Sequence, residues 1–238
     1  MGYSGAVLRF ISLPAEAPMQ AEAVYDKWIA MLEKISGEDP VMHQWRYAYG
    51  EQGISIDVHE RNRVINDAIK PEKKFDPKYS GEGLISFTSR GNFSPEEKKY
   101  YYIENGFSWG GERPGAFFID TGLLKKADWP NYWKVFANCL RHLSSIMPPL
   151  WADVAPQRYR PHAVFPHREW VGWMALVPDV DLSNEMPFVA MAEYLPNIGT
   201  LIVTTKDPFD PDNEEHIKLA RATEVFLADR GLLPERGM

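Results

Sequence analysis

Cysteine is almost absent from this chain of 238 residues, because Cys139 is the only one. An intrachain disulfide is therefore impossible, and nothing indicates an oxidising compartment. The sequence also lacks any apolar run near the roughly 18 residues that a transmembrane helix needs. Its N-terminus shows no basic region, long apolar run or small-residue cleavage site of the kind found in secretory signal peptides. We therefore expect a soluble, cytoplasmic protein that does not contact a membrane.

The sequence also has no excess of basic residues. The sequence holds 26 Lys and Arg against 33 Asp and Glu, so the net charge is -7, and the pI is about 5.4. A protein that binds nucleic acid through its phosphates needs a basic surface. We therefore expect no nucleic acid as a ligand, and the acidic balance suits a basic partner instead.

No repeat of fixed period and no glycine- or serine-rich linker divides the chain. With 45% apolar and 25% charged residues, the composition is that of a globular protein, and we expect a single compact domain over residues 1–238. Two residue types are in excess, with 8 Trp and 19 Pro. Tryptophan is common in cores and at interface hot spots, while proline interrupts regular elements. The two excesses therefore predict a loop-rich protein with a large surface for recognition.

Hydrophobic periodicity predicts three long helices and a larger number of strands. Trp28 belongs to an apolar face at helical spacing in the first helix, Pro148 and Pro149 end the second, and Gly231 ends the third. The helices are expected over residues 22–35, 130–147 and 211–230, the last with Asp210 as its N-cap, and the strands over residues 5–11, 54–58, 84–88, 116–120, 169–177, 188–194 and 199–205.

These strands and helices mix without strict strand–helix–strand alternation. The sequence therefore predicts an α+β fold, in which a mixed or mainly antiparallel sheet is packed by a few long helices, mainly on one side. Residues 156–166 are expected to be irregular, because three prolines interrupt them.

Gly106, Ser108 and Gly110 match the G-x-S-x-G pattern of a nucleophile elbow, which places its serine on a tight turn between a strand and a helix. The residues that follow are rich in glycine and proline, so they cannot begin the helix whose N-terminus contributes to an oxyanion hole. The favoured interpretation is a glycine-rich loop between strands. A serine hydrolase that uses Ser108 is the alternative function. A third class, a module that binds small molecules, requires a deep, closed apolar pocket.

Two groups of potential metal ligands lack the necessary pattern. Four acidic residues between positions 207 and 214 resemble a calcium loop, but the glycine and the distal glutamate of such a loop are missing. His162 and His167 are separated by Pro166 and preceded by Pro161, so no single helix carries both, and no cysteine is near. No glycine-rich phosphate loop follows a strand. We expect no metal ion and no cofactor.

The C-terminal stretch carries the most recognisable pattern. In order, it contains GTLIVTT (199–205), PFD (208–210), NEEH (213–216) and GLLP (231–234). This pattern resembles the closing strand, turn and helix of bacterial toxin-immunity proteins of the immunity protein 52 family. The segment WVGW (170–173) and the glycine-rich segment 106–111 are similar to that family too, as are the chain length and the acidic, tryptophan-rich composition.

The resemblance implies a non-catalytic protein that binds an antibacterial toxin and blocks its active site or its assembly. Such toxins are often effectors of type VI secretion systems. Those paired with this family are nucleases of the restriction-endonuclease type, whose targets lie in the cytoplasm. The expected partner is therefore a cognate toxin with a nuclease domain, bound by a monomer or a homodimer of this chain.

The chemistry of such a pair guides the choice of contact residues. A nuclease active site is basic because it holds phosphate, so an acidic inhibitor gains association rate by electrostatic steering. Aromatic side chains supply desolvated anchors in many interfaces. The residues predicted to contact the toxin are Asp179, Asp181 and Glu185 of the acidic loop 178–187, together with Trp109, Arg113 and Trp170.

Overall fold

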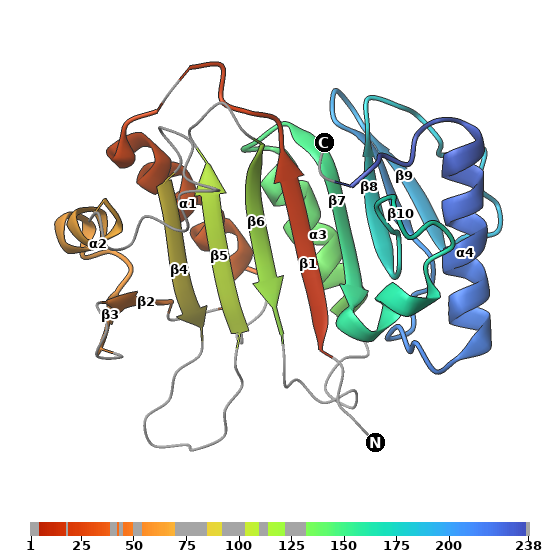
Figure 1. Cartoon of the computed structure of the whole chain (residues 1–238), viewed down its shortest axis with the longest axis horizontal. Helices are drawn as coiled ribbons and strands as arrows, with labels where there is room; N and C mark the ends of the chain where they lie inside the picture. The colour runs from red at the N-terminus through yellow and green to blue at the C-terminus, as the bar shows by residue number, and fades with distance from the viewer. Residues whose placement is uncertain are drawn as a thin grey trace.

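The computed structural model describes residues 5–17, 19–38, 42, 45–49, 54–69, 85–91, 103–109, 114–121 and 132–236. Within these residues, ten strands form one sheet in the order β3-β2-β4-β5-β6-β1-β7-β8-β10-β9, and each neighbouring pair is antiparallel (Figure 1). The strands are β1 (Ala6–Ser12), β2 (Arg46–Tyr49), β3 (Ile54–Asp57), β4 (Ile85–Gly91), β5 (Ile103–Trp109), β6 (Gly115–Asp120), β7 (Pro149–Pro156), β8 (Met174–Pro178), β9 (Met191–Leu195) and β10 (Gly199–Val203). The predicted α+β class with a mainly antiparallel sheet is confirmed.

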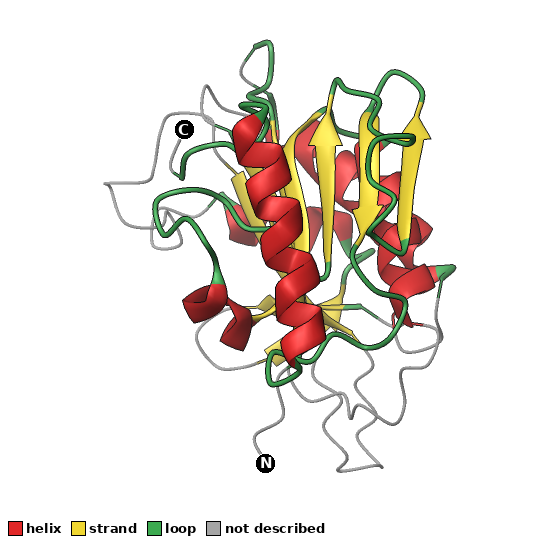
Figure 2. Ribbon diagram, turned by 90° about the vertical axis from the view of Figure 1, so that its right-hand side faces the viewer, coloured by secondary structure: helices red, strands yellow, loops and turns green. Residues whose placement is uncertain are grey.

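The helices pack on both faces of this sheet. They are α1 (Ala21–Ser36), α2 (Arg61–Ala68), α3 (Tyr132–Ser144), α4 (Glu214–Asp229) and a 3-10 helix, η4 (Gln157–His162). In Figure 1, α1 and α3 lie behind the sheet, and the side view in Figure 2 shows the long helix α4 on the opposite side of its C-terminal half. We refer to these two sides as the α3 face and the α4 face. Among the described helices, none has the length and apolarity needed to cross a membrane.

The placement of α4 differs from the expectation that helices pack mainly on one side. Met174 and Leu176 of β8 belong to the core cluster on the α3 face, while Ala175 and Val177 pack with Leu227 of α4. In β10, Leu201 and Val203 share the first cluster and Ile202 the second. A strand with two apolar faces needs cover on both sides, because successive side chains point in opposite directions. The continuous apolar runs of β8 and β10 therefore require a helix on each face.

Strand β7 is the main element that sequence reasoning missed. The prolines at positions 148 and 149 predict the end of a helix, and those from position 156 predict an irregular stretch. Instead, Pro149 is the first residue of β7, a position where a strand tolerates proline because no ladder hydrogen bond is required of its nitrogen. The strand lies between β1 and β8 near the middle of the sheet, with Asp153 opposite Arg9 on one side and Ala175 on the other.

The strand predicted over residues 169–177 begins later, at Met174. Gly172 interrupts it with a φ of 58°, and the Trp173 amide donates to the carbonyl of Val154 at 2.9 Å. The two tryptophans of this segment lie in different environments. Trp173 is 1% exposed and its ring packs edge-on against Phe136 of α3, whereas Trp170 lies half-buried on the α4 face.

Helix α4 begins at Glu214, three residues later than predicted. Asn213 is the N-cap, and its side-chain oxygen accepts from the Glu215 amide at 3.0 Å. Asp210 caps the preceding turn instead, because its carboxylate accepts from the Asp212 amide. Gly231, with a φ of 69°, follows the end of the helix as expected.

The two left-handed glycines of this region give a matched stability test. A Cβ on Gly172 meets the Ala155 Cβ at 2.4 Å, whereas a Cβ on Gly231 meets nothing within 4 Å. Gly231→Ala is therefore expected to cost about 1 kcal/mol of backbone strain. Gly172→Ala adds overpacking to that strain and is expected to cost about 3 kcal/mol. Urea denaturation measures both values, and equal costs for the two variants contradict the close contact at Gly172.

Candidate partner-binding surface

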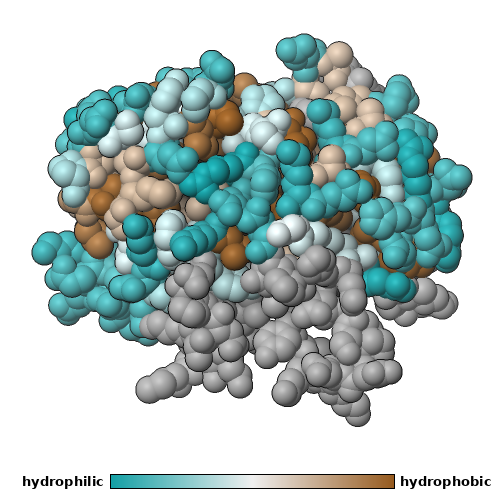
Figure 3. Space-filling model, turned by 180° about the vertical axis from the view of Figure 1, so that it is seen from behind, coloured by the Kyte–Doolittle hydropathy of each residue, from teal (hydrophilic) through white to brown (hydrophobic). Residues whose placement is uncertain are grey.

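The C-terminal edge of the sheet forms one side of the molecule together with the loop 179–190 and α4 (Figure 2). Three exposed acidic side chains and three large apolar side chains, each 37 to 42% exposed, come from these elements. Seen from behind, apolar side chains gather at the side of the molecule where β9 lies, between hydrophilic areas (Figure 3). We call the following set the β9 surface: Asp179, Asp181, Glu185, Phe188, Tyr194 and Val225.

Hydrogen bonds hold the backbone of the loop that carries the acidic residues. The Asp179 amide donates to the carbonyl of Ile198 at 3.0 Å. The Thr200 hydroxyl accepts from the Leu182 amide at 2.9 Å and donates to the carbonyl of Val180 at 2.6 Å. Leu182 is 1% exposed, so the loop is also anchored by its apolar side chains. This loop therefore presents its carboxylates from a preorganised backbone, which reduces the entropy lost on binding.

The acidic side chains of the loop differ in how they are paired. The Asp181 carboxylate accepts from the amide and the hydroxyl of Ser183, and these hydrogen bonds lower the pKa of Asp181. Glu185 pairs with Arg230 at 3.2 Å across the end of α4. In the described part of the chain, no basic side chain forms an ion pair with Asp179 or Asp181. Two carboxylates therefore remain available for a basic partner.

Apolar side chains border the same loop. The ring centroid of Phe188 lies 5.9 Å from that of Phe226 on α4, and the Arg230 guanidinium stacks on Phe226 at 3.6 Å. Val225, one residue before Phe226 in the helix, is 40% exposed. Exposed apolar groups beside exposed carboxylates give this side of the molecule the mixed character of a protein interface.

The remaining predicted contact residues do not join the β9 surface. Trp109 is the last residue of β5, opposite Ile85, and Arg113 lies outside the described residues. Because β5 and β8 run in the same direction, Trp109 and Asp179 lie at the same end of the sheet. They are separated by four strand spacings, or about 19 Å. Trp170 precedes β8 and lies toward the opposite end of that strand.

Trp170 is held in a buried ionic cluster. Its ring lies between the guanidinium groups of Arg9 and Arg236, at 4.2 and 3.8 Å from the ring centroid, and its indole nitrogen donates to Asp153 at 3.0 Å. Arg9 binds Asp153 at 2.6 Å and Glu169 at 2.7 Å. Such restraint fits a role in joining β1, β7 and the C-terminal segment better than a role as a movable contact residue.

Ser108 lies within a strand rather than on a turn. Its backbone pairs with Ser86 of β4 on one side and with Ala116 of β6 on the other. The glycine-rich loop that we expected here is therefore wrong for residues 106–109, which are part of β5. A nucleophile elbow requires a sharp turn into a helix, so this position does not support a hydrolase.

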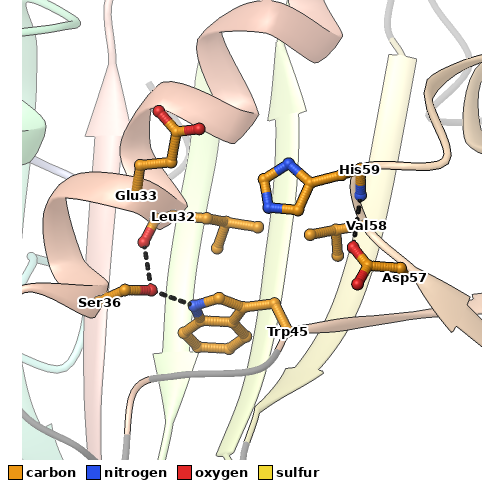
Figure 4. Close-up of a pocket in the computed structure, with 7 residues that line it drawn as sticks. All are labelled: Leu32, Glu33, Ser36, Trp45, Asp57, Val58 and His59. Atoms are coloured by element: carbon orange, nitrogen blue, oxygen red, sulfur yellow. Dashed lines mark hydrogen bonds between the residues drawn. The ribbon is translucent and has the colours of Figure 1, made fainter.

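A partly open pocket of about 320 Å³ lies between α1 and the turn after β3 (Figure 4). Leu32, Trp45 and Val58 form its apolar part, and the Trp45 indole nitrogen donates to the Ser36 hydroxyl at 2.9 Å. Its other lining residues are Glu33, Asp57 and His59. This is not the deep, closed apolar pocket that a small-molecule module requires. No three potential metal ligands gather anywhere in the described ranges.

The exposed apolar members of the β9 surface were not predicted from the sequence. Phe188 and Tyr194 stand in a predicted strand, where an aromatic residue indicates burial, and Val225 stands in a predicted helix. The signal that was available is the flanking of the strand by Pro187 and Pro196, which is typical of an edge position.

Comparisons with known proteins agree with the pattern at the C-terminus. Residues 132–236, from α3 to the end of the described chain, match the model of a family described as immunity protein 52. The resemblance seen in the sequence is thus confirmed for this part. Among solved structures, the Pseudomonas aeruginosa T6SS protein PA0821 matches with a TM-score of 0.52 and 14% identity, over 96% of this chain and 75% of that chain. At this identity the likeness shows a shared fold. The search of curated proteins found no match.

The ionic cluster at Trp170 predicts a pH dependence of stability. Burial raises the pKa of Asp153 from 3.8 to about 6, against the opposing effect of Arg9. Between about pH 4 and 6 the folded protein therefore keeps a proton that the unfolded chain has lost. The free energy of unfolding falls as the pH rises through this range, and above it the contribution of Asp153 no longer changes with pH.

The variant Asp153→Asn removes this contribution. We expect the difference in unfolding free energy between wild type and variant to change from pH 4 to 6 and to stay constant above pH 7, as measured by urea denaturation at several pH values. A difference that is constant from pH 4 to 8 contradicts the raised pKa.

Proposed function

We propose that this protein is a non-catalytic immunity protein that binds a cognate toxin, a nuclease effector of a type VI secretion system, and neutralises it. The observation that carries the proposal is the match of residues 132–236 to the immunity protein 52 family. The acidic loop 179–190 and the edge strand β9 both lie inside that matched region. The fold shared with a T6SS protein is consistent with the same role.

The charge of the β9 surface supports a nuclease as the target. A nuclease must hold phosphate, so its active site attracts anions. Asp179 and Asp181 present carboxylates without basic partners in the described chain, from a backbone that is already ordered. Such a surface imitates the charge of nucleic acid and accelerates encounter with a basic cleft.

The first experiment asks whether the complex exists. The protein is co-expressed with the product of the adjacent gene, and both cell survival and co-purification are measured. We expect survival that depends on this protein and a stable complex. A neighbouring gene product that is harmless on its own and does not bind contradicts the proposed function.

The contribution of the loop is tested with Asp179→Asn/Asp181→Asn. Asparagine tolerates the φ of 59° at position 179 and can still accept from Ser183 at position 181, so the fold is kept while two charges are lost. We expect the association rate constant to fall roughly three- to tenfold at low ionic strength and little in high salt. Stopped-flow mixing with the toxin measures it.

Glu16→Gln/Glu22→Gln is the matched control, because both residues are exposed near the start of α1, away from the β9 surface, and the same two charges are lost. The control is expected to associate almost as fast as wild type. An equal slowing in both double variants attributes steering to net charge and removes the loop from the interface.

A further inference from the structure

We propose that the toxin binds by adding a strand to the free edge of β9, and that this strand carries basic residues. The inference rests on the proposed function and names the mode of binding at the same site. Strand addition gives affinity through main-chain hydrogen bonds, and the alternating side chains of the added strand give specificity.

The hydrogen-bond pattern of β10 shows which groups of β9 face outward. The Asp179 amide donates to the carbonyl of Ile198, and the Thr204 amide donates to the carbonyl of Trp173. Within β10 the even-numbered residues therefore bond toward β8; at Thr204, which follows the strand, the amide still does so while the carbonyl accepts from the Ala190 amide at 3.3 Å. Gly199, Leu201 and Val203 consequently bond toward β9, where their register partners are Leu195, Glu193 and Met191.

The amide and carbonyl groups of Ala192 and Tyr194 must then point away from β10. In the described part of the chain, no strand pairs with this outer edge. An unpaired row of donors and acceptors is a template for another strand. Proteins commonly blunt such an edge with an outward lysine or a proline within the strand, and β9 has neither.

Side chains on the α4 face extend this template. Ala192 and Tyr194 share that face with Phe226 of α4, and Tyr194 is 42% exposed. An added strand therefore places every second residue over an apolar surface. We expect apolar residues at those positions of the toxin strand.

Charge selects a toxin strand over a second copy of this chain. Glu193, at the centre of β9, already pairs with Arg141 of α3, so the charge that selects the partner comes from the neighbouring acidic loop. Asp179 is bonded beside the C-terminal end of β9, and Asp181 follows in the same loop. A strand with basic residues complements this surface, whereas a second acidic copy does not.

The test uses Ala192→Pro, which removes one outward amide and no hydrogen bond to β10. Proline is tolerated at edge strands when its nitrogen faces solvent, so the melting temperature of the free protein is expected to stay close to that of wild type. Binding to the toxin is expected to weaken at least about tenfold. The matched control Ala192→Val keeps the amide and is expected to bind like wild type.

Hydrogen exchange of the wild-type complex gives a second measurement that does not depend on the folding of a variant. We expect the amides of Ala192 and Tyr194, which point away from β10, to become protected when the toxin is bound. A complex in which these amides stay unprotected, and in which Ala192→Pro binds as tightly as wild type, overturns strand addition and leaves the proposed function standing.

Two further outcomes also overturn strand addition by the toxin. Protection of the Ala192 and Tyr194 amides in the free protein, with a dimer mass in solution, shows that a second copy occupies β9. Absence of any complex with the toxin contradicts both this inference and the proposed function.

Discussion

The double-sided burial of β8 and β10 is the constraint on which the C-terminal half of the molecule depends. Every residue of β10 and the first four of β8 are buried. The chain must therefore supply α3 on one face and α4 on the other. Once α4 is placed there, the loop 179–190 has to pass beside it, and β9 becomes the last strand of the sheet. The position of the proposed interface thus follows from the need to cover an apolar strand twice.

A buried carboxylate, that of Glu224, connects several segments of the same half. Glu224 of α4 accepts from the Tyr159 hydroxyl at 2.7 Å and from the amides of Val164 and Val171. Burial raises its pKa, and these three donors oppose that effect. A buried carboxylate destabilises the fold unless it is well hydrogen-bonded. The segment 159–171 supplies the three donors to Glu224, so it has to keep one conformation. A rigid scaffold of this kind suits an interface that is ordered before its partner arrives.

Local pattern was sufficient for several elements. The sequence predicted the apolar face of α1, the strand β10 and the body of α4 with errors of a few residues. The spacing of apolar residues that indicates a helix or a strand involves only residues close together in the chain. Strand β7 was missed because its terminal prolines, Pro149 and Pro156, suggest a break in structure. The start of β8 was misplaced because only the packed structure shows that Gly172 lies against Ala155.

The sequence by itself determined the α+β class, the acidic charge, the likeness to immunity proteins and the loop that holds Asp179, Asp181 and Glu185. These properties depend on composition and on residues close together in the chain. Only the tertiary structure decided that β9 is an edge strand of the described sheet, that the Trp170 ring lies between two arginines, and that Trp109 lies four strands from the acidic loop. The reason is physical. The exposure of a side chain and the order of strands depend on contacts between segments that are distant in the chain, and the hydrophobic periodicity of one segment does not indicate which other segment covers it.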